Sequence, residues 1–78
     1  MSWKIVYRSA LRDWREPDVE VRRALLQWLE SLAVDGPPLL SEVDEDHGFL
    51  RTIAPTGTVV AYFVDHDQRL IAIVSLRS

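Results

Sequence analysis

Two histidines are the only side chains in this chain with an ordinary pKa near neutrality, and each stands among carboxylates. His47 directly follows the acidic run 44–46, and His66 has an aspartate on either side. A histidine beside a carboxylate can act as an acid–base pair or hold a divalent metal ion. Both groups occur in polar stretches typical of turns, and neither has a recognised metal-ligand spacing. We therefore expect ordinary surface turns at both histidines and no metal site.

Basic side chains gather at the start of the chain, where six of the nine lysines and arginines fall within residues 1–23. Five of them form a candidate surface for an acidic partner segment or nucleic acid, namely Arg8, Arg12, Arg15, Arg22 and Arg23. These groups can meet near the start of the main helix if Arg8 points off the sheet and Arg12 and Arg15 lie on the connecting turn. The alternative is a solvated face on which neighbouring carboxylates balance the arginines.

Trp14 lies within this basic region and belongs to neither of the strong periodic patterns beside it. It is a further candidate for partner binding, because tryptophan is enriched among the residues that dominate binding at protein interfaces. The alternative is that Trp14 seals an edge of the hydrophobic core.

Composition narrows the class of protein. The 78 residues, with no cysteine, form a single domain over 1–78, near the lower size limit for a core without disulfides or metals. The net charge of −3 and pI near 5.2 disfavour nucleic acid or the ribosome as partner. No signal peptide and no apolar run of roughly 20 residues occurs, so we expect a cytoplasmic protein without membrane contact. No phosphate loop, nucleophile elbow or paired-cysteine motif indicates a cofactor.

One strand and one helix are predicted in the first half of the chain. Trp3, Ile5 and Tyr7 alternate with Lys4, Val6 and Arg8, a period-two pattern that predicts a strand. Residues 9–14 allow one short helical turn. The main helix is predicted from the segment Glu16-Pro17-Asp18 to Val34, because its apolar residues recur at helical spacing. These apolar residues are Val21, Leu25, Trp28, Leu29 and Leu32. A glycine and two prolines directly after Asp35 end the helix.

The second half predicts a sheet. Residues 39–47 have neither helical nor strand periodicity and are expected to form a solvated loop. Three extended runs follow at 49–54, 58–64 and 69–76, with turn residues between them. The middle run is nearly all apolar, which is typical of a central strand covered on both faces or nearly so. The order strand–helix–strand–strand–strand predicts an α+β domain in which one main helix covers one face of an antiparallel meander.

The meander carries a series of short motifs. Gly48-Phe49-Leu50-Arg51 is followed by an apolar strand with a central Tyr62, an acidic turn at 65–67, and a closing strand 71–76 that ends at Arg77. In this order the motifs resemble the RelE/ParE-type toxin family of bacterial toxin–antitoxin systems. The resemblance covers most of the chain and implies a RelE-like fold.

The resemblance also implies site residues. It makes Arg51 and Arg77 the candidate catalytic residues, which would contact phosphate or stabilise developing negative charge. From the residues alone, both are strand-end arginines of the kind that protect sheet edges. Departures from the family pattern are Val59, where an arginine is common, and Leu76, where a histidine or lysine often occurs. The chain also lacks the basic or tyrosine-bearing tail of the RNA-cleaving members, so we expect a poor nuclease.

Three functions remain open at this point. The leading one is a small RelE/ParE-like toxin or toxin-like protein, catalytically degenerate or truncated, that acts through contact with a cognate antitoxin or another cellular protein. The second is ribosome-dependent messenger RNA cleavage by Arg51, Arg77 and the early arginines. The third is a non-enzymatic structural module, such as a homodimer through an open sheet edge. Whether the chain is an enzyme is left undecided.

Overall fold

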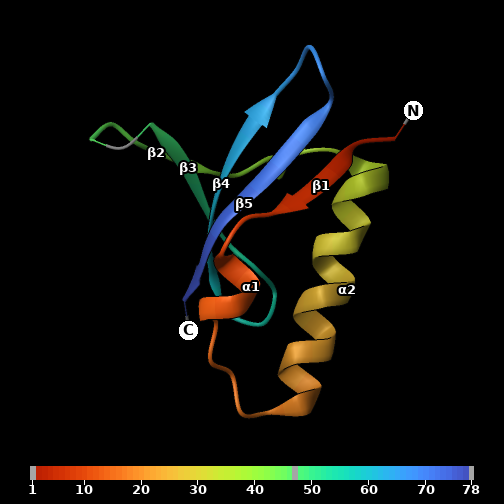
Figure 1. Ribbon diagram of the computed structural model, residues 1–78, viewed down its shortest axis with the longest axis vertical. Helices are drawn as coiled ribbons and strands as arrows, with labels where there is room; N and C mark the ends of the chain where they lie inside the picture. The colour runs from red at the N-terminus through yellow and green to blue at the C-terminus, as the bar shows by residue number, and fades with distance from the viewer. Residues whose placement is uncertain (1, 47, 78) are drawn as a thin grey trace.

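A computed structural model of the chain describes residues 2–46 and 48–77, so His47 and its expected surface turn lie outside the described residues. The elements follow in the order β1 (Lys4–Tyr7), α1 (Ala10–Asp13), α2 (Val19–Asp35), β2 (Glu42–Asp44), β3 (Phe49–Ile53), β4 (Val59–Asp65) and β5 (Leu70–Arg77) (Figure 1). Within the described ranges, no helix is long and apolar enough to cross a membrane.

The strands form one five-stranded sheet in the order β1-β5-β4-β3-β2, with β4 in the middle. The run from β2 to β5 is the predicted antiparallel meander with one strand added, whereas β1 pairs in parallel with β5 and sets Ile5 opposite Ile71. The β4–β5 register shifts between Ala61 and Tyr62, which is a β-bulge. The predicted α+β architecture with one main helix is confirmed.

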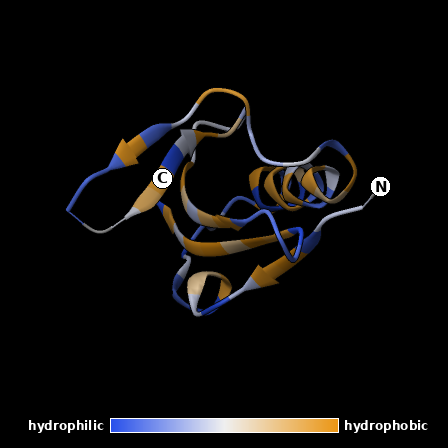
Figure 2. Ribbon diagram, turned by 90° about the horizontal axis from the view of Figure 1, so that it is seen from above, coloured by the Kyte–Doolittle hydropathy of each residue, from blue (hydrophilic) through white to orange (hydrophobic). Residues whose placement is uncertain are grey.

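Helix α2 packs its apolar stripe onto one face of the sheet, as Figures 1 and 2 show. Its Leu25 and Leu29 are fully buried, and Leu32 nearly so. They share one core cluster with alternate residues of the two central strands, namely Val60, Tyr62, Ile71, Ile73 and Leu76. Because side chains alternate across a strand, this packing sends the residues between them to the opposite face.

Both ends of α2 follow the predicted signals. The Asp18 carboxylate accepts hydrogen bonds from the backbone N–H groups of Glu20, at 2.9 Å, and Val21, at 3.4 Å. At the other end the N–H of Gly36 donates to the Leu32 carbonyl at 2.9 Å. Gly36 has a φ of +85°, a conformation that residues with a Cβ rarely adopt, so glycine ends the helix for a conformational reason.

The loop predicted over residues 39–47 is wrong in its middle, where β2 forms. Val43 lies opposite Leu50, and β2 pairs antiparallel with β3 over three residues. The pairing uses backbone hydrogen bonds at the sheet edge, where charged side chains are common and little burial is needed. A three-residue edge strand therefore leaves no apolar periodicity in the sequence. The short helical turn allowed at 9–14 is present as α1.

Candidate open-face site

The face of the sheet opposite α2 is the candidate site, and we call it the open face. Its residues are those that alternate with the core positions, namely Glu42, Asp44, Phe49, Arg51, Ile53, Val59, Ala61, Phe63, Ala72, Ser75 and Arg77. The expectation that β4 is covered on both faces or nearly so holds at Ala61 but not at Val59. Ala61 is only 5% exposed on this face, but Ile53 is 70% and Val59 36% exposed. The apolar run of β4 reflects its central position rather than a second covering layer.

Cross-strand pairing arranges the open face in three rows that run from β2 to β5. The first row contains Ile53, Val59 and Arg77. The second row contains Glu42, Arg51, Ala61 and Ser75. The third row contains Asp44, Phe49, Phe63 and Ala72. Each row therefore has a polar or small side chain at one end or at both ends.

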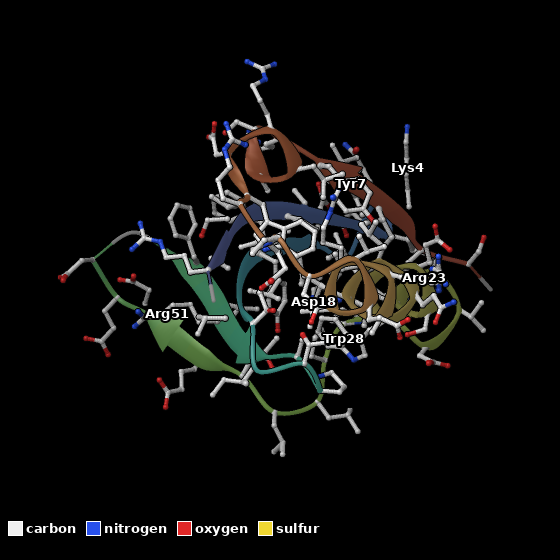
Figure 3. All side chains as sticks on the ribbon, turned by 90° about the horizontal axis from the view of Figure 1, so that it is seen from below. Lys4, Tyr7, Asp18, Arg23, Trp28 and Arg51 are labelled. Atoms are coloured by element: carbon white, nitrogen blue, oxygen red, sulfur yellow. The ribbon has the colours of Figure 1, made fainter. Side chains whose placement is uncertain are left out.

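Arg51 and Arg77 are both exposed and lie on this same face. They are two strands apart and one row apart, which places their Cα atoms about 12 Å from each other. Figure 3 shows Arg51 on the side of the molecule away from Trp28 and Arg23 of α2. Since an arginine side chain spans several ångströms, both guanidinium groups can reach one extended anionic ligand.

The third row adds an aromatic pair and a third arginine. The rings of Phe49 and Phe63 pack edge to face, with centroids 4.8 Å apart and an angle of 72°. The guanidinium carbon of Arg8 lies 5.7 Å from the centroid of Phe63, which is a cation–π contact. Arg8 reaches this position because it directly follows β1 and still lies alongside β5. Its backbone N–H donates to the Ile73 carbonyl there. The structure thus brings Arg8 together with Arg51 and Arg77.

Apolar side chains border the arginines at the other end of the face. Leu40, Ile53 and Val59 line a hollow of about 650 Å³, with Arg51 and Glu42 on its wall. Leu40, in the connector before β2, is 86% exposed. The Thr52 hydroxyl holds this connector in place by donating to the Leu40 carbonyl at 2.8 Å. The hollow thus combines exposed apolar surface with an arginine.

The remaining predicted arginines do not join this group. Arg15 donates from Nη1 to the Arg12 carbonyl at 2.6 Å, which ties it to the end of α1. Arg22 and Arg23 line a separate hollow on the outer side of α2. Figure 3 places Arg23 on the side of α2 away from α1. The structure therefore distributes the five early arginines over three surfaces, because β1 carries Arg8 onto the sheet while the chain turns back into α2.

Trp14 packs against the hydrophobic core and is partly buried. Its indole Nε1 is buried and has no hydrogen-bond acceptor among residues 2–46 and 48–77. These observations favour the sealing role over that of an exposed anchor, since the apolar ring is turned into the protein.

His66 lies at the β4–β5 turn, and its ring centroid is 5.8 Å from that of Trp3. Arg69 also contacts Trp3, and its guanidinium carbon lies 6.0 Å from the centroid of the Trp3 ring. His66 comes five positions after Ala61 of the second row, along extended β4 and into the turn that follows, which is roughly 16 Å. No three histidines, aspartates or glutamates of the described part of the chain are close enough together to hold a metal ion.

One tyrosine outside the open face has a perturbed ionisation. Burial raises the pKa of Tyr7 above its ordinary 10.0, and the negative charge of Glu30 raises it further. Tyr7 lies opposite Ile73, in the layer between the sheet and α2. Among residues 2–46 and 48–77, the open face contains arginines and carboxylates but no histidine. Its chemistry is suited to holding an anionic or acidic ligand rather than to proton transfer near neutral pH.

A mixed sheet with one main helix, a parallel first strand and an arginine-bearing open face defines the structural class of this chain. No family model matches the sequence, and no curated protein is significantly similar to it. Among solved structures, the chain is similar to the free state of an arginine double mutant of the E. coli toxin RelE. The two share a TM-score of 0.72 and 16% sequence identity, over 100% of this chain and 84% of that one. The fold is therefore RelE-like, as the motif order of the meander predicts.

Proposed function

We propose that this chain is a RelE/ParE-like toxin or toxin-like protein of bacteria that acts in the cytoplasm through protein–protein contact. The open face is its binding surface, and a cognate antitoxin or another protein target is the partner. The observation that carries the proposal is the presence of Arg8, Arg51 and Arg77 on one exposed face beside Ile53 and Val59. The RelE-like fold supports it, since the structural neighbour is itself a toxin.

The chemistry of the face defines the partner segment. Exposed Ile53 and Val59 are stabilised by burial against apolar side chains, and the arginines form charge-assisted hydrogen bonds with carboxylates. A segment that alternates apolar and acidic residues matches this pattern.

The test is co-expression of the chain with the products of adjacent small genes, followed by pull-down and a growth assay. We expect one of these products to co-purify with the chain, and expression of the chain alone to slow growth. The double variant Arg51→Glu with Arg77→Glu should lose the partner, because two attractive charges become repulsive. Arg23→Glu, on the outer side of α2, is the matched control and should retain it. A chain with no partner and no effect on growth contradicts the proposal.

Ribosome-dependent messenger RNA cleavage is the second candidate function. One observation favours it, since three arginines on a single face can contact several phosphates. Two observations disfavour it, namely the overall charge of −3 and the position of Glu42 beside Arg51 on the same face. An in vitro translation assay decides the matter: message that remains intact at high protein concentration rules out cleavage, and a wild-type activity lost in Arg51→Ala supports it.

A further inference from the structure

We infer that the open face also binds a second copy of this chain, face to face, around a two-fold axis that runs parallel to β3 and β4 and between them. The inference does not rest on the proposed function, because it concerns the purified chain alone. It names a second copy of the chain as the ligand of the open face and specifies which residues of the two copies meet.

One end of the open face, at the first row, is apolar and exposed. Ile53 is 70% and Val59 36% exposed, and Leu40 beside them is 86% exposed. A contiguous apolar patch of this kind on a small protein marks an interaction site. Covering it stabilises any complex in proportion to the apolar area removed from water.

The charges of the face differ between its two sides. The β2 side carries Glu42 and Asp44, whereas Arg77 lies on β5 and Arg8 reaches over from β1 to Phe63. A dimer with two-fold symmetry must present the same surface twice, so its interface has to be complementary to itself. Arg51 on β3 lies beside Glu42, so one side holds two acids and one arginine and the other side holds Arg77 and Arg8. The two sides differ in net charge, which meets this requirement when the axis lies midway between them.

The row arrangement makes the match specific. Rotation about an axis parallel to the strands exchanges β3 with β4 and β2 with β5, while each row stays at its own height. In the first row, Ile53 then faces Val59 of the second copy. In the second row, Arg51 faces the small Ala61. In the third row, Phe49 faces Phe63 of the second copy. Two sheets stacked in this way have the aligned packing seen in β-sandwiches, about 10 Å apart.

The same rotation places opposite charges together. Arg77 at the β5 side comes over the β2 side of the second copy, where its long side chain is one row from Glu42. Arg8, above Phe63 in the third row, comes over the region of Asp44. Two copies thus form two equivalent sets of opposite-charge contacts, one on either side of the axis.

Pairing through the free edge of β2 is disfavoured by the same charges. That arrangement would bring Glu42 and Asp44 of one copy next to Glu42 and Asp44 of the other, which is repulsive. The strand is also only three residues long, so few backbone hydrogen bonds would be gained. The charges therefore favour stacking of two open faces over pairing through the edges of β2.

Sedimentation velocity of the purified chain over a range of concentrations is the first test. We expect a concentration-dependent dimer, and we expect Ile53→Glu to be monomeric throughout that range. Val34→Glu is the matched control, since Val34 is 76% exposed on α2, and this variant should dimerise like the original chain. Circular dichroism confirms that each variant is folded. An original chain that is monomeric at every concentration overturns the inference.

A charge exchange tests the arrangement without any apolar substitution. Arg77→Glu alone and Glu42→Arg alone should each weaken self-association about tenfold or more, which is the effect expected of like charges at an interface. A mixture of the two variants should restore it, because each Glu then faces an Arg in the heterodimer. Self-association that is unaffected by both substitutions overturns the arrangement. Binding of only a different protein at this face, with no dimer in its absence, overturns it as well.

Discussion

The hydroxyl groups of Ser41 and Tyr62 are hydrogen-bonded to each other, although the two residues are 21 positions apart in the chain. Ser41 belongs to the connector between α2 and β2, and Tyr62 lies on β4, the middle strand of the sheet. Tyr62 is 1% exposed and its ring belongs to the core. The hydrogen bond therefore ties the connector, and with it edge strand β2, to the centre of the fold.

Removal of the Ser41 hydroxyl should lower the free energy of unfolding more than removal of the Tyr62 hydroxyl. Ser41→Ala leaves the Tyr62 hydroxyl in its partly buried site without its protein partner, which costs about 1–3 kcal/mol of unfolding free energy. Tyr62→Phe leaves only the exposed Ser41 hydroxyl without a partner, so about 0.5–1.5 kcal/mol should be lost. Urea denaturation of both variants and of the double variant measures the difference. A larger loss for Tyr62→Phe than for Ser41→Ala would contradict this account.

Gly36 and Gly57 provide a matched pair for testing backbone conformation. Both have positive φ, +85° and +88°, but a Cβ at Gly36 would lie 3.0 Å from the Trp3 Nε1, whereas none of the described atoms lies within 4 Å at Gly57. Gly57→Ala should lose about 1–2 kcal/mol for the left-handed conformation alone. Gly36→Ala should lose more, because the Trp3 ring must also move. Equal losses in thermal or urea denaturation would show that the contact with Trp3 has no energetic effect.

The N-terminal cap of α2 should contribute a measurable part of the stability. Asp18→Ala removes the carboxylate that accepts from the Glu20 and Val21 N–H groups and should cost about 1 kcal/mol. Asp18→Asn is the control, since asparagine caps nearly as well. Urea midpoints distinguish the two variants. Equal losses in both would indicate that the charge of Asp18, rather than its hydrogen bonds, stabilises the helix.

Tyr7 should make the protein less stable in alkali. Its pKa is raised in the folded state, by burial and by Glu30, so the unfolded chain loses the phenolic proton first as the pH rises through 10.0. The unfolded state then binds fewer protons than the folded state, and the free energy of unfolding falls with pH in that range. Below this range the effect is absent.

Urea denaturation between about pH 9 and 11 tests this relationship. Tyr7→Phe should show a shallower decline than the original chain, whatever its stability at neutral pH. Glu30→Gln should have an intermediate slope, because one of the two causes of the shift remains. Identical slopes in all three proteins would exclude Tyr7 as the source of the decline.

Local signals in the sequence predict the main helix well. Its stripe of leucines, the Asp18 cap and the glycine that follows Asp35 all act within a few residues of the helix, and the structure confirms them. The meander is predictable for the same reason, since its turns and its apolar runs alternate along the chain. Strand β2 is not, because three charged or exposed edge residues pair through their backbone alone.

The candidate site depends on contacts between distant parts of the chain. Sequence analysis identifies Arg51 and Arg77, but their common face follows from the strand register and the bulge between Ala61 and Tyr62. Arg8 joins them because β1 pairs with β5, a contact across more than sixty residues. The predicted strand at 3–8 distinguishes Arg8 from Arg12 and Arg15, but no local signal pairs that strand with β5, so the place of Arg8 beside Phe63 was not predictable.

The position of β5 has a consequence for how the protein is made. β5 comes after all the other strands in the chain, yet it lies between β1 and β4. During synthesis the first strand therefore has no neighbour in the sheet until residues 70–77 have emerged. Until then, the edge of β4 that pairs with β5 is also unpaired. Long-range pairing of this kind slows folding. The arginines of the open face thus come together only after translation has passed the last strand, so in the newborn chain these cations are still scattered.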